Sequence, residues 1–169
     1  MTGSNTGNWI LAAPPLFLAH EIEEHITALP WAEKHASIIP EFVRSAIPDS
    51  PAFIAYAGLL FLILFSVAGA LALRSKPQSI AWMVLAILFT ARLENAVLHT
   101  IESIVFMQYT PGVVTAILIV LPLTFYLMRR LVRLELIRRA WLPGIIVGGF
   151  IAQTAAIGAM LFLGAGIDR

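Results

Sequence analysis

Two short segments of this sequence carry histidine and glutamate side chains inside stretches that are otherwise apolar. The first reads His20-Glu21-Ile22-Glu23-Glu24-His25, and the second contains Glu94, Asn95, His99 and Glu102. The chain has no cysteine, which excludes disulfides, thiolate metal sites and iron–sulfur clusters. Imidazole and carboxylate groups are ligands that iron, manganese and zinc accept in proteins. The two segments therefore indicate metal chemistry.

Helical geometry gathers most of the first segment on one face. At about 100° per residue, His20, Glu23 and Glu24 share a face of a helix. Glu21 and His25, which are four residues apart, lie together beside that face. We interpret these two as residues that orient ligands or line the entrance to the site.

The second segment forms a stripe of its own. Asn95, His99 and Glu102 have the spacing i, i+4 and i+7, which aligns them along one side of a helix. Glu94 lies one step from the edge of the stripe, and Arg92 lies near His99 at the other edge. Asn95 is expected to orient a metal ligand rather than to bind metal itself.

The charges of the two segments favour metal ions over an empty polar core. The five glutamates carry five negative charges, and Arg92 carries one positive charge. An unpaired charge buried in a membrane costs several kcal/mol. Two divalent cations would balance the four charges that remain. Ferritin-like proteins build comparable di-metal sites from Glu-x-x-His pairs and further glutamates on facing helices. The expected cofactors are two divalent metal ions, with iron favoured and zinc or manganese possible, held by His20, Glu23, Glu24, Glu94, His99 and Glu102.

Several roles stay open at this point. We expect catalytic functions for Glu24, Glu94, Arg92 and Tyr109. Glu94 is either a ligand or the partner of Arg92, and Arg92 either neutralises a carboxylate or holds a substrate anion. Tyr109 is either catalytic or an anchor at the membrane interface, where tyrosine is common. The simpler alternative for both clusters is a proton-sharing polar core that joins two helices.

The elements that position these residues are predicted to be membrane-spanning helices. The chain is 59% hydrophobic and 12% charged, with a mean hydropathy of +0.87, whereas soluble domains are nearer half apolar and a quarter charged. A spanning helix needs about 20 mostly apolar residues. We predict an all-α polytopic bundle, a single transmembrane domain over 1–169, with helices at 9–29, 52–73, 79–107, 112–130 and 143–167 and an outer loop at 30–51.

The first predicted helix has an unusual start. No lysine or arginine precedes Lys34, and the apolar run meets ionisable residues where a cleavage site would lie, so a signal peptide is rejected. Pro14 and Pro15 are expected to begin the helix, because proline suits the first turn. The ordered helix would then cover only 14–29.

Basic residues predict the orientation. They gather in the connections after the second and fourth predicted helices: Arg74, Lys76, Arg129, Arg130, Arg133, Arg138 and Arg139. The positive-inside rule puts these connections and the N-terminus in the cytoplasm and the C-terminus outside an inner or plasma membrane. Both polar clusters then lie at the same depth, in the outer half, so helices 9–29 and 79–107 must touch.

Three motifs resemble a known family. His20-Glu21-Ile22-Glu23-Glu24, Asn95-Ala96-Val97-Leu98-His99 and Tyr109-Thr110-Pro111-Gly112 are similar to the His-x-x-Glu-Glu, Asn-x-x-x-His and Tyr-Ser-Pro-Gly motifs of the HXXEE family. Thr110 replaces the serine. The family consists of small multi-pass membrane proteins, and the resemblance, which covers roughly 9–165, implies a membrane enzyme without a defined substrate or reaction.

The leading functional hypothesis is a non-haem di-metal oxidoreductase that acts on a lipophilic substrate. A zinc-dependent intramembrane hydrolase and a proton or divalent-cation transporter are the alternatives. The expected partner is a membrane lipid or another lipophilic small molecule, and the net charge of +1 gives no indication of nucleic acid. Small residues at four-residue spacing in the last helix allow close packing, either within the chain or in a homo-oligomer.

Overall fold

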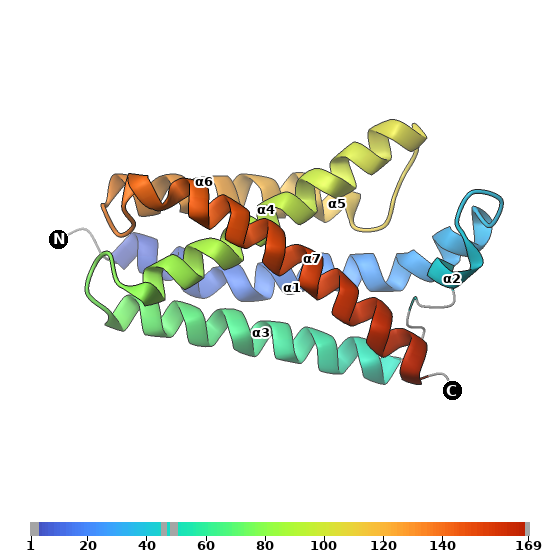
Figure 1. Cartoon of the computed structure of the whole chain (residues 1–169), viewed down its shortest axis with the longest axis horizontal. Coiled ribbons are helices and arrows are strands. Elements are labelled where there is room, and N and C mark those ends of the chain that lie inside the picture. Colours follow the sequence, from blue (N-terminus) through green and yellow to red (C-terminus); the bar gives the residue numbers. More distant parts are fainter. Residues whose placement is uncertain (1–3, 45–46, 48–50, 168–169) are drawn as a thin grey trace.

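The computed structural model describes residues 4–44, 47 and 51–167, and within them the chain forms helices and no strand. The long helices are α1 (Ser4–Lys34), α3 (Pro51–Arg74), α4 (Ile80–Phe106), α6 (Leu121–Arg133) and α7 (Leu142–Ile167). The short elements are α2 (Glu41–Arg44), α5 (Val113–Thr115), the π-helical turn η1 (Ala116–Val120) and the 3₁₀ turn η2 (Arg139–Trp141). Consecutive long helices alternate in direction along the molecule, and α7 crosses α4 (Figure 1). The all-α prediction is confirmed.

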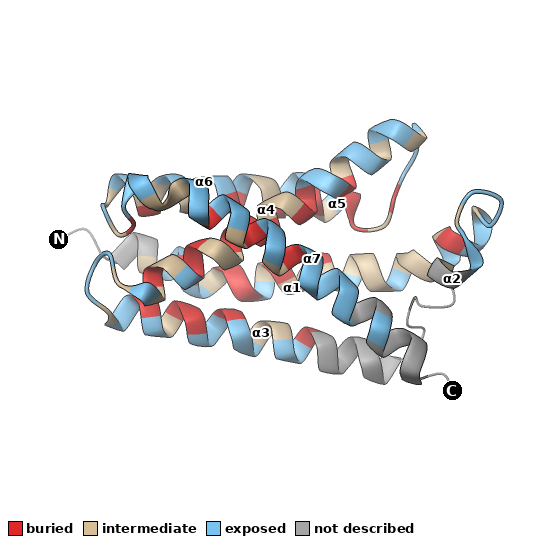
Figure 2. Cartoon of the chain, viewed as in Figure 1, coloured by how far each residue is buried: buried red, intermediate tan, exposed pale blue. Residues whose placement is uncertain are grey.

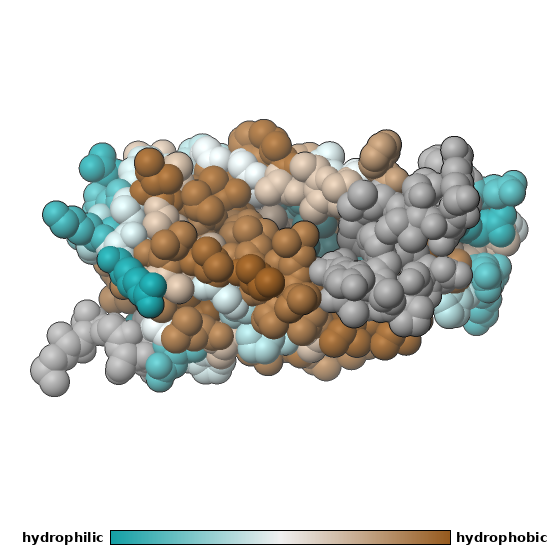
Figure 3. Space-filling view, turned by 90° about the horizontal axis from the view of Figure 1, so that it is seen from below, coloured by the Kyte–Doolittle hydropathy of each residue, from teal (hydrophilic) through white to brown (hydrophobic). Residues whose placement is uncertain are grey.

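Among the described residues, three segments are long and apolar enough to cross a membrane: Ile80–Phe106, Val113–Arg133 and Arg139–Ala159. The apolar part of α3 over Gly58–Arg74 is shorter. On the face drawn in Figure 3, a broad apolar surface lies between two hydrophilic ends. These features are those of a membrane protein, since a water-soluble protein rarely exposes a continuous apolar surface of this extent.

Helix α1 differs from the prediction at its start. It runs over Ser4–Lys34, beyond the predicted 9–29 at both ends, and Pro14 and Pro15 lie in its interior. The prediction that the prolines begin the helix is wrong. Proline in a helix interior removes a hydrogen bond and costs about 3 kcal/mol, but packing on both sides of the pair outweighs this preference. Ile10, Ala13 and Phe17 are almost completely buried and hold α1 in the core.

The core forms around α4, which packs against α3, α6 and α7 (Figure 2). An aromatic cluster of Phe17, Phe65 and Phe89 lies in this core, with ring centroids 5.5 to 6.3 Å apart. Phe17 stands one turn before His20, so the cluster borders the polar residues of α1. The interior of the bundle therefore changes from apolar to polar along α1.

The segment 113–133 is one helical rod with a local distortion. Pro122 has no N–H to donate, and its ring would clash with a carbonyl of the preceding turn in a regular helix. The π-helical turn Ala116–Val120 ends two residues before Pro122 and widens the helix there. Such turns are frequent at functional sites, and this one directly follows Thr115.

The two basic connections meet at one end of the bundle. The backbone N–H of Gln78 donates to the carbonyl of Leu136 across a distance of 2.8 Å. This bond joins the α3–α4 connection to the connection that follows α6. The two connections therefore lie at the same end of the bundle, and the side of the membrane that they face stays a prediction.

Two glycines of α7 allow it to approach α4 closely. A Cβ atom at Gly148 would lie 3.2 Å from Ile87, and one at Gly149 would lie 2.7 Å from Thr90 and 3.0 Å from the backbone nitrogen of Ala91. At Gly158, by contrast, a Cβ would meet none of the described residues within 4 Å. Part of the small-residue stripe thus packs within the chain, and only the rest remains for the predicted homo-oligomer.

We expect Gly149→Ala to destabilise the protein by about 1–3 kcal/mol, because the added methyl group overlaps a β-branched side chain and backbone. Gly158→Ala is the matched control on the same helix and should leave stability unchanged. Thermal unfolding of the purified proteins in detergent measures both. Equal unfolding temperatures for the two variants would contradict the close packing of α7 on α4.

Candidate metal centre

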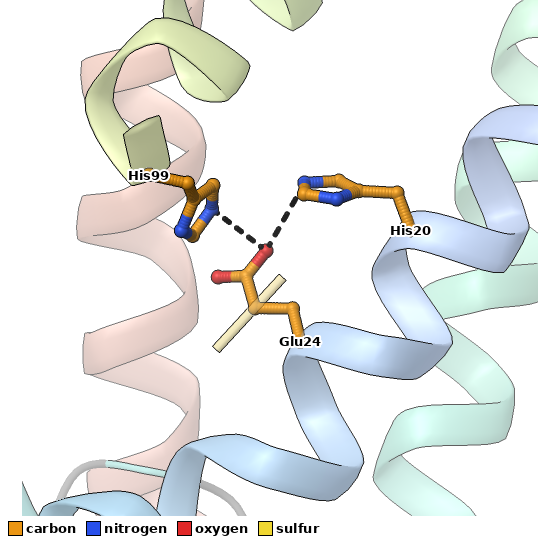
Figure 4. Close-up of side chains that lie close together, drawn as sticks. All are labelled: His20, Glu24 and His99. Carbon is orange, nitrogen blue, oxygen red and sulfur yellow. Dashed lines mark ion pairs between the residues drawn. The ribbon is translucent and has the colours of Figure 1, made fainter. Parts of the chain in front are cut away.

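Three side chains from the two polar segments converge on one point. The ligand atoms of His20, Glu24 and His99 all lie within 4.8 Å of one another. Glu24 Oε2 is 3.8 Å from His20 Nε2 and 3.4 Å from His99 Nε2 (Figure 4). For metal–ligand bonds of about 2.1 Å, tetrahedral ligand atoms lie about 3.4 Å apart. The three atoms therefore need only small shifts to share one metal ion.

A hydrogen-bond relay determines which nitrogen of His20 faces this point. The hydroxyl of Thr115 donates its single hydrogen to the Glu23 carboxylate, because a carboxylate can only accept. Toward His20 Nδ1, 2.9 Å away, the Thr115 oxygen must then accept. Nδ1 of His20 consequently carries a proton, and Nε2 is the atom turned toward Glu24. Histidines that bind metals are commonly oriented through their second nitrogen in this way.

His99, like His20, turns its Nε2 atom toward Glu24. The Asn95 amide nitrogen donates to His99 Nε2 across 3.3 Å, so this Nε2 holds a lone pair and the proton is on Nδ1. Nδ1 faces Glu102 Oε2 at 3.7 Å. The Asn95 amide oxygen lies 2.8 Å from His20 Nε2, and because this oxygen can only accept, Nε2 donates to it as long as no metal ion takes the place of that proton. One amide thus bridges both imidazoles. Asn95 thus contacts both histidines, and its role in orienting a metal ligand stays a prediction.

The turn before α5 fits closely around His20. Gly112 has a φ of +78°, and a Cβ there would lie 2.9 Å from His20 Cε1 and 3.4 Å from Glu24 Cβ. Only glycine meets both requirements, since it lacks the Cβ and adopts a positive φ without strain. In the same turn, the hydroxyl of the buried Thr110 donates to the carbonyl of His99 at 3.2 Å. The turn thus holds both histidine-bearing helices.

Glu23 is one of the predicted metal ligands, but its carboxylate accepts hydrogen bonds from other parts of the chain. Its carboxylate accepts from the backbone N–H of Thr115 at 2.8 Å and of Val114 at 3.3 Å, and from the Tyr109 hydroxyl at 3.0 Å. These N–H groups belong to the first turn of the 113–133 rod, where a carboxylate stabilises the helix dipole. Partial burial raises the pKa of Tyr109, and the nearby Glu23 carboxylate adds to the increase. Tyr109 therefore stays protonated and serves as a donor to Glu23.

Arg92 forms an ion pair with Glu21, not with Glu94. Its other terminal nitrogen donates to Gln153 Oε1 at 3.0 Å, and its guanidinium lies over the ring of Phe61. Arg92 is 7% exposed. This cluster joins α1, α3, α4 and α7, and it balances the charge of Glu21 beside the candidate centre.

The remaining predicted site residues lie outside the three-residue cluster. Glu94 has one buried carboxylate oxygen that accepts no hydrogen bond from the described residues. His25 contacts the carbonyl of Glu21 through Nδ1 at 2.7 Å. The Glu102 side chain is 52% exposed, and its Oε2 lies 3.7 Å from His99 Nδ1. The geometry therefore unites fewer ligands than the six that the sequence predicts.

The family model described as "Protein of unknown function with HXXEE motif" matches residues 11–127. The chain belongs to the HXXEE family. No curated protein and no solved structure matches the chain. The motifs that carried the resemblance meet at the candidate centre, because His20, Asn95 and Gly112 come from three different motifs and lie in contact.

Two residues of this arrangement are not among the site residues predicted from the sequence. Thr115 completes the relay to His20, and its sequence signal is weak because threonine at a helix start is common. Gln153 was identifiable as a buried polar residue in a highly apolar helix, where such a side chain requires a partner. Arg92 is that partner.

The relay predicts that Thr115→Val weakens metal binding by about 10- to 100-fold, the usual effect of losing a group that orients a ligand. Thr115→Ser, which retains the hydroxyl, should bind as the wild type does. Titration of the purified, metal-free protein with cobalt(II), followed by visible absorption, measures both. If Thr115→Val and Thr115→Ser bind equally well, the hydroxyl does not orient His20.

Proposed function

We propose that this HXXEE protein is a membrane-embedded metalloenzyme in which His20, Glu24 and His99 hold one divalent metal ion. The observation that carries the proposal is the convergence of these ligand atoms, each histidine presenting Nε2. Three protein ligands leave further positions for water or substrate, which is typical of catalytic rather than structural metal sites.

One ion suits this geometry better than the predicted pair. Glu23 is occupied by Thr115 and Tyr109, and Glu94 is not part of the cluster. With one divalent ion, the Glu24 carboxylate offsets one of the two positive charges of the metal, while Glu21 is paired with Arg92. The two-metal centre stays a prediction that would require Glu94 and Glu102 to move toward His99.

We propose oxidation of a lipophilic substrate at non-haem iron as the reaction class. Two histidines and one carboxylate with open positions are the ligand set of non-haem iron(II) oxygenases. The metal supplies the redox chemistry when it is bound. The chain contributes the orientation of His20 through Thr115, the bridging amide of Asn95, and the apolar core that limits water on one side of the site.

The membrane arrangement forms part of this proposal. We propose that α1, α3, α4, the 113–133 rod and α7 all span the membrane, with the N-terminus in the cytoplasm and the C-terminus outside. The basic connections joined through Gln78 and Leu136 then face the cytoplasm. The metal site lies in the outer half, where a lipophilic substrate can enter from the bilayer.

The aromatic cluster argues against the transporter alternative. Phe17, Phe65 and Phe89 are buried together beside the polar residues, on the side toward the basic end. A transported ion needs polar groups or water along its path, and this part of the bundle offers phenyl rings. The site is therefore better suited to chemistry than to passage.

A zinc hydrolase remains the second candidate, because two histidines and one glutamate also form the zinc site of some metallopeptidases. The two candidates differ in redox chemistry, which zinc lacks. We expect protein loaded with iron(II) under anaerobic conditions to consume dioxygen when a lipid extract is added, and His99→Ala to consume none. If loaded wild type leaves dioxygen unchanged and zinc is the metal retained on purification, hydrolysis replaces oxidation.

A further inference from the structure

A second site lies at the basic end of the bundle, where α6 ends and α7 begins (Figure 1). A cleft of about 320 Å³ opens there, and its lining includes three arginines and one glutamate: Arg133, Arg138, Arg139 and Glu135. The cleft is positively charged on balance. We propose that it binds the phosphate of an anionic phospholipid headgroup.

The cleft is shaped before any ligand arrives. Arg138 Nε donates to Gln78 Oε1 across 2.8 Å, and its guanidinium lies 5.4 Å from the centre of the Trp141 ring. Gln78 is itself tied to the carbonyl of Leu136. A side chain that is fixed in the free protein loses little conformational freedom on binding, which favours affinity.

The backbone of the connection stabilises the same shape. Glu135 has a φ of +54° and lies just after α6. The N–H of Leu136 donates to the carbonyl of Leu131 and that of Glu135 to the carbonyl of Val132, the pair of bonds that closes many helix C-termini. The turn therefore redirects the chain after α6, with Arg133 and Arg139 both exposed on the cleft.

The surroundings favour a lipid over a soluble phosphate. Trp141 lies beneath Arg138, and tryptophan is enriched where a membrane meets water. Farther along α7, Ile146, Val147 and Phe150 are exposed, so acyl chains can lie against the helix while the headgroup occupies the cleft. Basic pockets between membrane helices on the cytoplasmic side are known to bind anionic headgroups.

The experiment titrates purified full-length protein in neutral detergent with phosphatidylglycerol or phosphatidylcholine of equal chain length, and native mass spectrometry counts bound lipid. We expect phosphatidylglycerol to bind at least about tenfold more tightly. Arg133→Gln/Arg139→Gln should weaken it about 30-fold, because each arginine near an anionic lipid contributes roughly fivefold. If this variant does not fold, the single variants are measured, each with about fivefold loss expected.

Arg74→Gln/Lys76→Gln is the matched control, because it removes two exposed positive charges at the same end but outside the cleft. Its affinity should stay close to the wild-type value. An equal loss in this control would replace the site with diffuse surface attraction. Equal binding of both lipids, or full competition by millimolar inorganic phosphate, would also overturn the proposal. The readout needs no metal, so its failure leaves the proposed enzyme untouched.

Discussion

Loss of any one of His20, Glu24 or His99 is expected to lower the affinity for cobalt(II) at least about 100-fold, the upper end of what losing an outer-shell group costs. The three ligand atoms share one point, so His20→Ala, Glu24→Gln and His99→Ala should behave alike. Each removes one of three bonds to the same ion. Visible absorption of the cobalt-loaded protein measures the affinity.

Two controls separate the shared site from general histidine or carboxylate effects. His35 contacts Gln108 and stacks on Trp31 at the end of α1, so His35→Ala should bind cobalt as the wild type does. Glu94→Gln should also bind one equivalent. A loss of one of two equivalents in Glu94→Gln would revive the di-metal centre. Full binding in His99→Ala would contradict the centre itself.

The second large effect concerns the ion pair between Arg92 and Glu21. We expect Arg92→Met to destabilise the protein by about 3–5 kcal/mol, because it leaves a buried carboxylate without its partner. The side chains of Arg92 and Glu21 are 9% and 14% exposed, so water compensates little. Thermal unfolding in detergent measures the loss.

The double variant Arg92→Met/Glu21→Met is the control that identifies the cause. It removes both charges, and replacing a buried ion pair by apolar side chains is often neutral. We expect it to recover most of the stability lost in Arg92→Met and to keep its metal. Equal destabilisation of the single and double variants would show that packing of Arg92 on Phe61 and Gln153, rather than charge, is what matters.

The sequence predicts most of the helices because apolar length determines them. The segments 52–73, 79–107 and 143–167 agree closely with α3, α4 and α7. The error at Pro14 and Pro15 has a definite cause: local preference puts proline in the first turn, and the burial of Ile10 and Ala13 extends the helix past it. Tertiary packing of this kind cannot be read from the local sequence.

The candidate site is predictable in part for the same reason. The contact between His20 and Asn95 follows from two stripes on facing helices. The partners of the glutamates do not follow, because spacing alone gives Glu21, Glu23 and Glu24 similar positions. In the folded structure, Glu21 pairs with Arg92, Glu23 with Thr115 and Glu24 with His99. Gly112 lies in a turn between helices, outside the two polar helix faces. Its contact with His20 therefore could not be predicted from the spacing of residues on those faces.

Elemental analysis of the purified wild-type protein tests the central claim most directly. The protein is extracted from membranes in neutral detergent without chelators, and metal is measured against protein by mass spectrometry. We expect about one metal ion per chain, with iron favoured by the ligand set, and almost none in His20→Ala prepared in the same way. A folded wild-type protein without metal, or with equal metal in His20→Ala, would contradict it.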